Sequence, residues 1–360
     1  MRIVFATSTP TDVRGGSGTF VGISVLAEAL RRTGIDVRLV APSFQRSPLG
    51  HTFKRLRFNL ALGPRVAIHR PDRVIGFDLD GFLLSRPTPY PLAVAIKGVL
   101  AEELTFERGL VRRLLWLQSR CERANVRGEV RVLATSRYAA RRIGQHYDVA
   151  AERMRIVPEL IDLDRWQQAL AAIDTARQPA TILTVCHLYP RKRVRVLIDA
   201  MRQVMVTEPR ARLRIVGTGP EEAALQEQVR CLGLAEQVTF LGHVPFARLC
   251  AEYRAATAFC LPSVQEGFGI VLLEAMAAGL PIVACAAAAV PEVVPAGDCG
   301  LLVPPDNAAA LADALVQLLA GEALQRRLGD GGRERVRRYR ADTVAGEFLA
   351  AIGASSSTAR

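Results

Sequence analysis

The chain has 360 residues, half of them hydrophobic, and a formal net charge of +12. This length can bury two hydrophobic cores, so we expect two domains. The apolar runs are short and interrupted by Arg, Pro or Gly, and Met1 leads directly into a strand, so we expect neither a transmembrane span nor a signal peptide.

Seven scattered cysteines, none in a C-x-x-C pair, predict reduced thiols in a cytoplasmic protein without a disulfide framework or a metal site. The positive charge favours an anionic partner, which could be the diphosphate of a nucleotide, an anionic membrane or a nucleic acid. Nucleic acid is disfavoured because the sequence has no zinc finger, aromatic RNA-binding motif or basic region with heptads. The charge is explained equally well by a generally high arginine content that reflects amino-acid usage and indicates no partner. Peripheral contact of the protein with the inner face of a membrane remains an alternative hypothesis.

Residues 2–8 predict a strand, 9–18 a turn-rich loop and 19–32 an amphipathic helix. The glycine loop between strand and helix suggests a dinucleotide fold. A dehydrogenase is disfavoured, however, because the next strand ends at Ala41 and Pro42, where the ribose-binding acid of an NAD site belongs.

Residues 51–62 predict a helix with Phe53, Leu56 and Leu60 on one side and basic residues interleaved. Such a helix suits a membrane interface, but a helix packed on the sheet by its apolar side explains the pattern as well, and we favour this second interpretation.

Strands and helices alternate through the rest of the chain, which predicts parallel sheets covered on both faces. A strand over 92–96 ends at Lys97. The remaining expected elements are a helical region over 102–127, strand 130–135, helix 137–147, strand 181–186, helix 194–207, strand 212–216, helix 221–232, strand 237–241, helix 246–255, strand 258–261 and helix 306–319.

The stretch 261–281, LPSVQEGFGIVLLEAMAAGLP, holds two carboxylates at Glu266 and Glu274. The backbone N–H groups of a helix start suit an anion such as a diphosphate. A carboxylate buried among apolar residues is costly without a partner, so we expect Glu274 to face a polar ligand. Eight residues of helix would separate the two carboxylates by about 12 Å, roughly the span from a sugar to a ribose. Alternatively, the two glutamates have no ligand: Glu266 caps a tight turn and Glu274 is merely exposed to solvent.

This stretch resembles the two-glutamate signature of family-4 retaining glycosyltransferases, which have the GT-B fold. The resemblance implies that Glu266 orients the sugar, that Glu274 holds the ribose, and that the donor site includes the residues from Gly267 to Val271, namely Gly267, Phe268, Gly269, Ile270 and Val271. It also implies that the D-x-D spacing of Asp78 and Asp80 has no metal role, so we interpret these residues as a strand end and a helix start and expect no metal and no cofactor.

Smaller motifs extend the resemblance. Lys192 stands where the family has a lysine on the diphosphate, which implies a catalytic and donor-binding role, and His187 stands where the family has an arginine. The other donor-binding positions that the resemblance implies are Gly15, Gly16, Gly219 and Val244. Lys97 replaces the family's usual histidine, which leaves it as a candidate on the acceptor or phosphate side. Glu159 and Leu160 replace the family's Asn-Gly between the domains, whereas Asp162 is retained.

The resemblance implies an α/β architecture of two doubly wound Rossmann-like domains facing across a cleft, with an acceptor domain over 1–157 and a donor domain over 158–340. We expect the segment 341–360 to form a helix that returns to the first domain, with a disordered tail. The implied function is metal-independent, retaining transfer of a sugar from a nucleoside diphosphate sugar to an acceptor that is a small molecule, a lipid or a glycan. The alternatives are a GT-B epimerase of nucleotide sugars and a binding protein that has lost transfer.

Overall fold

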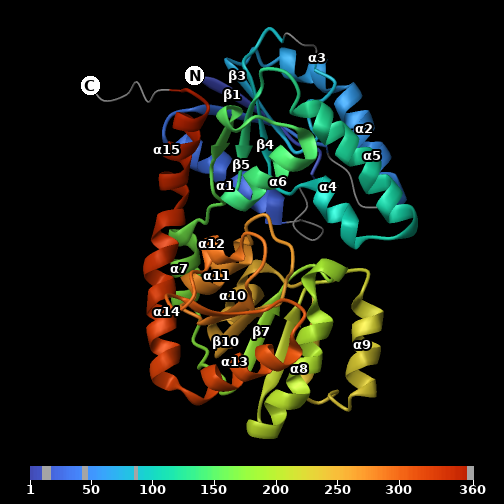
Figure 1. The fold of residues 1–360 in the computed structure, drawn as a ribbon. Helices are drawn as coiled ribbons and strands as arrows, with labels where there is room; N and C mark the ends of the chain where they lie inside the picture. The colour runs from blue at the N-terminus through green and yellow to red at the C-terminus, as the bar shows by residue number, and fades with distance from the viewer. Residues whose placement is uncertain (10–17, 43–47, 85–87, 355–360) are drawn as a thin grey trace. The chain divides into compact units, whose positions relative to one another are not determined.

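Two parallel β-sheets of six strands each organise the chain, and each forms the centre of its own compact unit (Figure 1). The structure, a computed structural model, describes residues 1–9, 18–42, 48–84 and 88–354. The first unit comprises residues 1–160 and 341–360, and the second comprises residues 161–340. The division falls three residues after the predicted boundary at 157.

The first sheet has the strand order β2-β1-β3-β4-β5-β6, with every pair parallel. Because β2 and β3 flank β1 on opposite sides, the strand order reverses between β1 and β3. The elements of this unit are β1 (Arg2–Ala6), α1 (Gly18–Arg32), β2 (Asp36–Val40), α2 (Pro48–Leu60), α3 (Leu62–Ala67), β3 (Arg73–Phe77), β4 (Leu92–Ile96), α4 (Leu100–Glu103), η2 (Leu104–Phe106), α5 (Gly109–Asn125), β5 (Arg131–Ala134), α6 (Arg137–Tyr147), η3 (Ala151–Arg153), β6 (Met154–Ile156) and α15 (Ala341–Ala351).

The second sheet has the strand order β12-β11-β10-β7-β8-β9, again all parallel. Here the order reverses between β7 and β10. The elements are α7 (Leu163–Ala171), β7 (Thr181–Val185), η4 (Pro190–Lys192), α8 (Val194–Thr207), β8 (Arg212–Val216), α9 (Glu222–Cys231), β9 (Val238–Gly242), α10 (Phe246–Ala255), β10 (Ala258–Leu261), α11 (Ile270–Ala277), β11 (Ile282–Cys285), α12 (Val290–Val293), β12 (Gly300–Val303), α13 (Ala308–Ala320), α14 (Glu322–Val336) and η5 (Arg337–Tyr339).

Helices cover both faces of each sheet, so the central strands are almost continuously apolar. In the first unit, Phe5 of β1 packs edge-on against Phe77 of β3 and Phe348 of α15, with ring centroids 5.2 and 5.8 Å apart. The helix α15 also packs along α1 (Figure 1). The last described helix is therefore part of the first unit although it lies at the end of the chain.

The helix α2 differs from the favoured prediction in the face that it buries. Phe53 and Leu60, which we expected to pack on the sheet, are exposed, whereas Arg55 and Asn59 are buried together with Phe58. The prediction is wrong because part of the interior contacted by this helix is polar, so hydrogen bonds hold Arg55 and Asn59 inward beside the apolar contacts of Phe58.

Two further predictions in the first unit are wrong. The helical region expected over 102–127 is broken between η2 and α5, where Glu107 and Arg108 have extended backbone conformations. No helix begins at Asp78, because residues 78–83 form turns after β3 and Asp78 itself has a positive φ of 54°. No helix within the described ranges is long and apolar enough to cross a membrane.

Candidate functional site

The reversal of strand order in the second sheet places the loops after β7 and β10 side by side at the carboxyl edge of the sheet. In open α/β sheets, connections leave such a point toward opposite faces, and ligands generally bind there. A hydrogen bond of 3.0 Å from the Val264 N–H to the Arg191 carbonyl joins the two loops. The loops carry Lys192 and Glu266, the two residues expected to act in catalysis.

Lys192 and Glu266 form an ion pair, with 2.6 Å between Nζ and Oε1. Lys192 ends the short helix η4, which begins at Pro190, and Arg193 then adopts a left-handed conformation (φ 51°) before α8 begins. Both charged side chains are largely buried. The structure therefore brings a cation and an anion together at the point where the fold places a ligand.

The helix α11 begins at Ile270, a short loop after Glu266, with Gly269 as its N-cap at a φ of 90°. A side chain is strained at such a φ, so glycine suits this position, and no side chain caps the helix start. Gly267, Ile270 and Val271 are partly exposed. Phe268 is different, because its ring is buried 5.3 Å from that of Tyr339, so only its backbone remains available to a ligand.

Glu274 lies on α11 and accepts a hydrogen bond of 2.8 Å from the Tyr253 hydroxyl of α10. Burial raises the pKa of Glu274 to about 7, although the bond from Tyr253 acts in the opposite direction. The Tyr253 ring is itself buried, stacked 5.7 Å from Phe259 and edge-on 5.5 Å from Trp166. The carboxyl group is therefore held at a fixed place by a rigid aromatic neighbour.

The predicted helical separation of the two glutamates is wrong. Glu266 precedes α11, so only the residues from Ile270 to Glu274 are helical, and their rise is about 6 Å rather than 12 Å. The loop from 266 to 269 supplies the remaining separation.

The loops after β7 and β8 pack backbone to backbone. Leu188 donates to the Thr218 carbonyl at 3.0 Å and accepts from the Glu221 N–H at 3.1 Å. A Cβ on Gly219 would lie 2.5 Å from the Leu188 carbonyl oxygen, so glycine is required there by packing. His187 is partly exposed with its ring 5.9 Å from that of Tyr189, while the neighbouring Leu188 is the side chain that turns into the core.

Val244, in the turn after β9, is partly buried against the same apolar cluster as Phe268 and Tyr253. Its exposed surface leaves it compatible with the predicted contact to a nucleotide base. The expected donor residues Gly15 and Gly16 lie outside the described residues.

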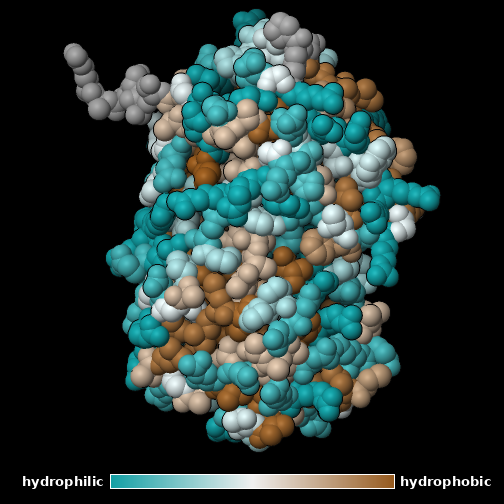
Figure 2. Space-filling model, in the orientation of Figure 1, coloured by the Kyte–Doolittle hydropathy of each residue, from teal (hydrophilic) through white to brown (hydrophobic). Residues whose placement is uncertain are grey.

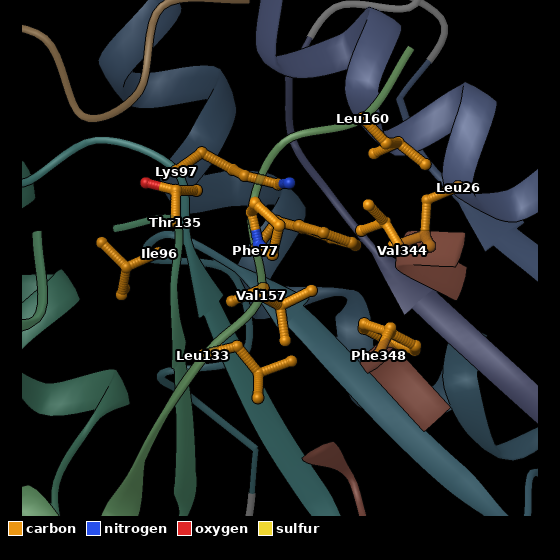
Figure 3. A pocket seen from close by; sticks show the side chains of 12 residues that line it. Leu26, Phe77, Ile96, Lys97, Leu133, Thr135, Val157, Leu160, Val344 and Phe348 are labelled. Atoms are coloured by element: carbon orange, nitrogen blue, oxygen red, sulfur yellow. The ribbon is translucent and has the colours of Figure 1, made fainter. Parts of the chain in front are cut away.

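In the first unit, Lys97 follows β4 and pairs with Glu159, with 3.0 Å between Nζ and Oε2. Both side chains are buried, and the ammonium lies 6.0 Å from the centre of the Phe77 ring. Gly22 of α1 lies close to this carboxylate, because an added Cβ would be 2.5 Å from Oε2. Lys97 and Thr135 lie at a small cavity that is otherwise apolar (Figure 3). Its other lining residues include Leu26, Phe77, Ile96, Leu133, Val157, Leu160, Val344 and Phe348.

Asp78 and Asp80 belong to a buried hydrogen-bond network at the reversal of strand order in the first sheet. The Asp80 carboxylate accepts from the Ser8 hydroxyl at 2.7 Å and from the Asn59 amide at 2.8 Å. The Asp78 carboxylate accepts from the Lys97 backbone N–H at 2.8 Å, and burial raises its pKa to about 6. These aspartates have structural partners, and the described part of the chain contains no group of three or more His, Cys, Asp or Glu side chains that could hold a metal ion.

Sequence reasoning missed two residues of these sites. Tyr253 lies in an ordinary amphipathic helix, and nothing in its spacing from Glu274 predicts their contact. Glu159 carries a signal, because it and Lys97 are two departures from the family's pattern, and such departures at distant positions suggest that the residues contact one another.

The chain matches two glycosyltransferase families, one over each half. Residues 16–165 match Glycosyltransferase Family 4, and residues 168–335 match the family described as glycosyl transferases group 1. The chain is 40% identical over 195 residues to the phosphatidyl-myo-inositol mannosyltransferase of Mycobacterium leprae, a match that covers 54% of this chain and 51% of that protein. The chain thus spans about half the length of the curated relatives that it matches.

Solved structures resemble the whole chain at lower identity. Sucrose-phosphate synthase from Thermosynechococcus elongatus is 23% identical with a TM-score of 0.81, and the match covers 99% of this chain and 100% of that one. Anabaena HepE, solved with UDP and glucose, is 18% identical with a TM-score of 0.72 and the same coverage. These likenesses, with the two six-stranded parallel sheets, confirm the predicted fold class of two Rossmann-like units.

Proposed function

Because the chain belongs to the glycosyltransferases of the GT-B fold, we propose that it transfers a sugar from a nucleoside diphosphate sugar to an acceptor. The observation that carries this proposal is the Lys192–Glu266 pair at the carboxyl ends of β7 and β10, next to the start of α11. The proposal also includes retention of the anomeric configuration, independence from a metal ion, and a cytoplasmic location, which seven free thiols suit.

Lys192 supplies the positive charge that the departing diphosphate requires. As the bond from the anomeric carbon to the diphosphate oxygen breaks, negative charge grows on the phosphate, and a preorganised cation in a largely dry site stabilises it strongly. An ammonium group has three N–H donors, so Lys192 can keep its bond to Glu266 and still donate to a phosphate oxygen. The N–H groups at the start of α11 add donors and the positive end of a helix dipole.

Glu266 orients the donor sugar in this proposal. Its Oε1 is occupied by Lys192, which leaves Oε2 to accept hydrogen bonds from sugar hydroxyls beside the diphosphate. Because the same carboxylate holds the lysine, one residue aligns the sugar with the group that stabilises its leaving phosphate. We assign no covalent role to Glu266.

Glu274 holds the ribose. An ionised carboxylate accepts two hydroxyl hydrogen bonds, whereas a pKa of about 7 leaves the unliganded group partly protonated at neutral pH. Tyr253 compensates part of the cost of ionisation and fixes the orientation of the carboxylate. Binding of a nucleotide therefore completes the set of donors that Glu274 lacks in the free protein.

The relatives support a nucleotide donor and leave the acceptor open. The Anabaena structure contains UDP and glucose, and the Mycobacterium leprae relative is named for a phosphatidyl-inositol acceptor and a mannosyl donor. Since these names imply different sugars, we propose neither the sugar nor the acceptor for this chain.

Product analysis with a panel of nucleotide sugars tests the proposal. Free nucleoside diphosphate that is released faster with a candidate acceptor, together with a product of unchanged anomeric configuration, supports retaining transfer. An isomerised nucleotide sugar would instead show an epimerase. Tight nucleotide-sugar binding without turnover for any acceptor would show a binding protein, and either of these results overturns the proposal.

A further inference from the structure

Large apolar side chains are exposed on neighbouring helices of the first unit. On α2, Phe53 is 65% exposed and Leu60 is 74% exposed, and Ile68 follows at the end of α3. On α5, Trp116 is 55% exposed, and Leu110 and Val111 are exposed in its first turn. Exposed aromatic and branched side chains gathered in this way mark a surface that binds a partner.

Hydrogen bonds fix the apolar stripe of α2 outward. Phe53 and Leu60 are seven residues apart and share one side of the helix with Arg57. On the opposite side, Arg55 donates to the Ser8 hydroxyl at 2.9 Å and Asn59 donates to Asp80 at 2.8 Å. Rotating the helix to bury the stripe would leave these buried polar groups unpaired, so the exposure is built into the fold.

The helix α5 lies beside α2 (Figure 1). Gln118 of α5 donates to the Thr52 hydroxyl at 3.0 Å and accepts from Arg55 at 3.0 Å, and Leu56 and Leu115 pack against one small apolar cluster between the helices. The outward side of α5 carries Trp116, with the Arg120 guanidinium 5.9 Å from its ring centre. The exposed residues of both helices therefore belong to one part of the first unit.

The two stretches that carry these exposed apolar side chains contain basic residues and no acidic ones. The sequence contains no Asp or Glu from residue 37 to 71 or from residue 108 to 121. Figure 2 shows brown apolar groups next to teal polar ones over the region where Figure 1 labels α2 and α3. The basic residues on α2, α3 and α5 that the structure describes as at least partly exposed are Lys54, Arg57, Arg65, Arg112, Arg113, Arg120 and Arg123.

We propose that this α2–α3–α5 surface docks on an anionic membrane. The aromatic and aliphatic side chains would enter the interfacial layer, and the arginines would contact lipid phosphates. The charge decides between a membrane and a second copy of the chain, because two such surfaces would bring only positive groups together. The proposal goes beyond sugar transfer, and it is tested by binding alone, so its failure leaves the proposed function intact.

Tryptophan fluorescence with phospholipid vesicles gives a direct readout, because the two tryptophans differ. Trp116 is exposed on α5, whereas Trp166 is buried in the second unit. We expect phosphatidylcholine vesicles that contain phosphatidylglycerol to shift the emission to the blue and to sediment the protein. Trp116→Phe should abolish the shift, and added salt should weaken sedimentation. Absence of sedimentation with these vesicles, or equal sedimentation with pure phosphatidylcholine, would overturn the proposal.

Matched variants place the docking surface. Phe53→Ser with Leu60→Ser should weaken vesicle binding at least tenfold, and Arg57→Gln should weaken it about fivefold. The controls come from α8 in the second unit, where Val206 is 83% exposed and Arg202 is also exposed. Val206→Ser and Arg202→Gln should bind vesicles as the wild type does. An equal loss of vesicle binding in the α2 and α8 variants would contradict the assignment of this surface. The assignment would also be contradicted if the wild type were a dimer and the Phe53 and Leu60 changes dissociated it.

Discussion

Each unit of this protein holds a lysine–glutamate pair beyond the carboxyl end of a parallel strand. Lys192 and Glu266 lie 2.6 Å apart in the second unit, and Lys97 and Glu159 lie 3.0 Å apart in the first. The surroundings differ. The Lys192–Glu266 pair adjoins a glycine-capped helix start, whereas the Lys97–Glu159 pair adjoins the Phe77 ring and the backbone of α1 at Gly22.

A lysine–glutamate ion pair can therefore have different roles, depending on the groups that surround it. Beside the backbone N–H groups of a helix start, a lysine already bonded to a carboxylate can still donate a hydrogen bond to an anionic ligand. Beside an aromatic ring and helix backbone, the pair mainly satisfies two buried charges. We therefore expect changes at the second-unit pair to affect transfer, and changes at the first-unit pair to affect stability.

The largest expected effect is on the stability of the first unit. Lys97→Met leaves the Glu159 charge buried without a partner, which should lower the free energy of unfolding by about 3–5 kcal/mol. The double variant Lys97→Met with Glu159→Gln should lose clearly less than the two single variants together. Hydrogen exchange of β4 and β5 in urea measures these losses for the first unit. Additive losses would show that the pair is not coupled.

The next effect is on turnover. Lys192→Ala should lower transfer about a hundredfold to a thousandfold because it removes the cation opposite the leaving phosphate, and Lys192→Arg should lose less. Arg193→Ala is the control, since Arg193 bonds to Asp306 at 2.7 Å. EDTA should leave the wild type unchanged. Loss of activity in EDTA that manganese restores would contradict metal independence.

Glu266→Ala should lower kcat about tenfold to a hundredfold while the affinity for the bare nucleoside diphosphate changes little. The reason is that this carboxylate contacts the sugar in our account, and a lost charged hydrogen bond is worth about 1.5–3 kcal/mol. Steady-state kinetics and calorimetry separate the two quantities. An equal loss in both would place Glu266 on the nucleotide instead.

The smallest expected effect is the pH dependence of donor affinity, in which two groups act in opposite directions. Glu274 has a pKa of about 7 in the free protein, and ribose hydroxyls favour its ionised form, so its contribution to affinity rises with pH up to about 7 and then levels off. Because an imidazole changes its charge near neutral pH, a contact between a protonated His187 and the diphosphate would add affinity that is lost as pH rises.

Variants separate the two contributions. With His187→Arg, donor affinity should only rise with pH. With Glu274→Gln, donor affinity should only fall with pH. Tyr253→Phe should move the rise to higher pH, because the lost hydrogen bond stabilised the carboxylate. Dissociation constants of the donor across the neutral pH range provide the measurement. If His187→Arg has the wild-type profile, His187 does not contact the phosphate.

The sequence predicted the fold because its signals are local. Short apolar strands alternating with helices specify two parallel sheets, and the predicted strands over 92–96 and 258–261 match β4 and β10. The two-glutamate motif placed Glu266 on a loop and Glu274 on a helix for the same reason. The proximity of Lys192 and Glu266 was predictable only through the family resemblance, since 74 residues separate them.

The parts that could not be predicted depend on contacts between distant segments. The polar inner face of α2 depends on Asp80 and Ser8, so the apolar stripe alone indicated the wrong buried side. Tyr253 contacts Glu274 only because α10 and α11 pack together in the second unit. Phe268 lies within the motif, yet Tyr339, 71 residues later, holds its ring in the core.

The most direct test of the account is calorimetric titration of bare nucleoside diphosphates with different bases. We propose that the nucleotide binds to the second unit, with Glu274 on the ribose and Lys192 on the diphosphate. At least one nucleoside diphosphate should bind the wild type, bind Glu274→Ala about tenfold to a hundredfold more weakly, and bind the Lys97→Met, Glu159→Gln double variant as it binds the wild type. Equal binding by the wild type and Glu274→Ala, or a comparable loss in the first-unit variant, would contradict it.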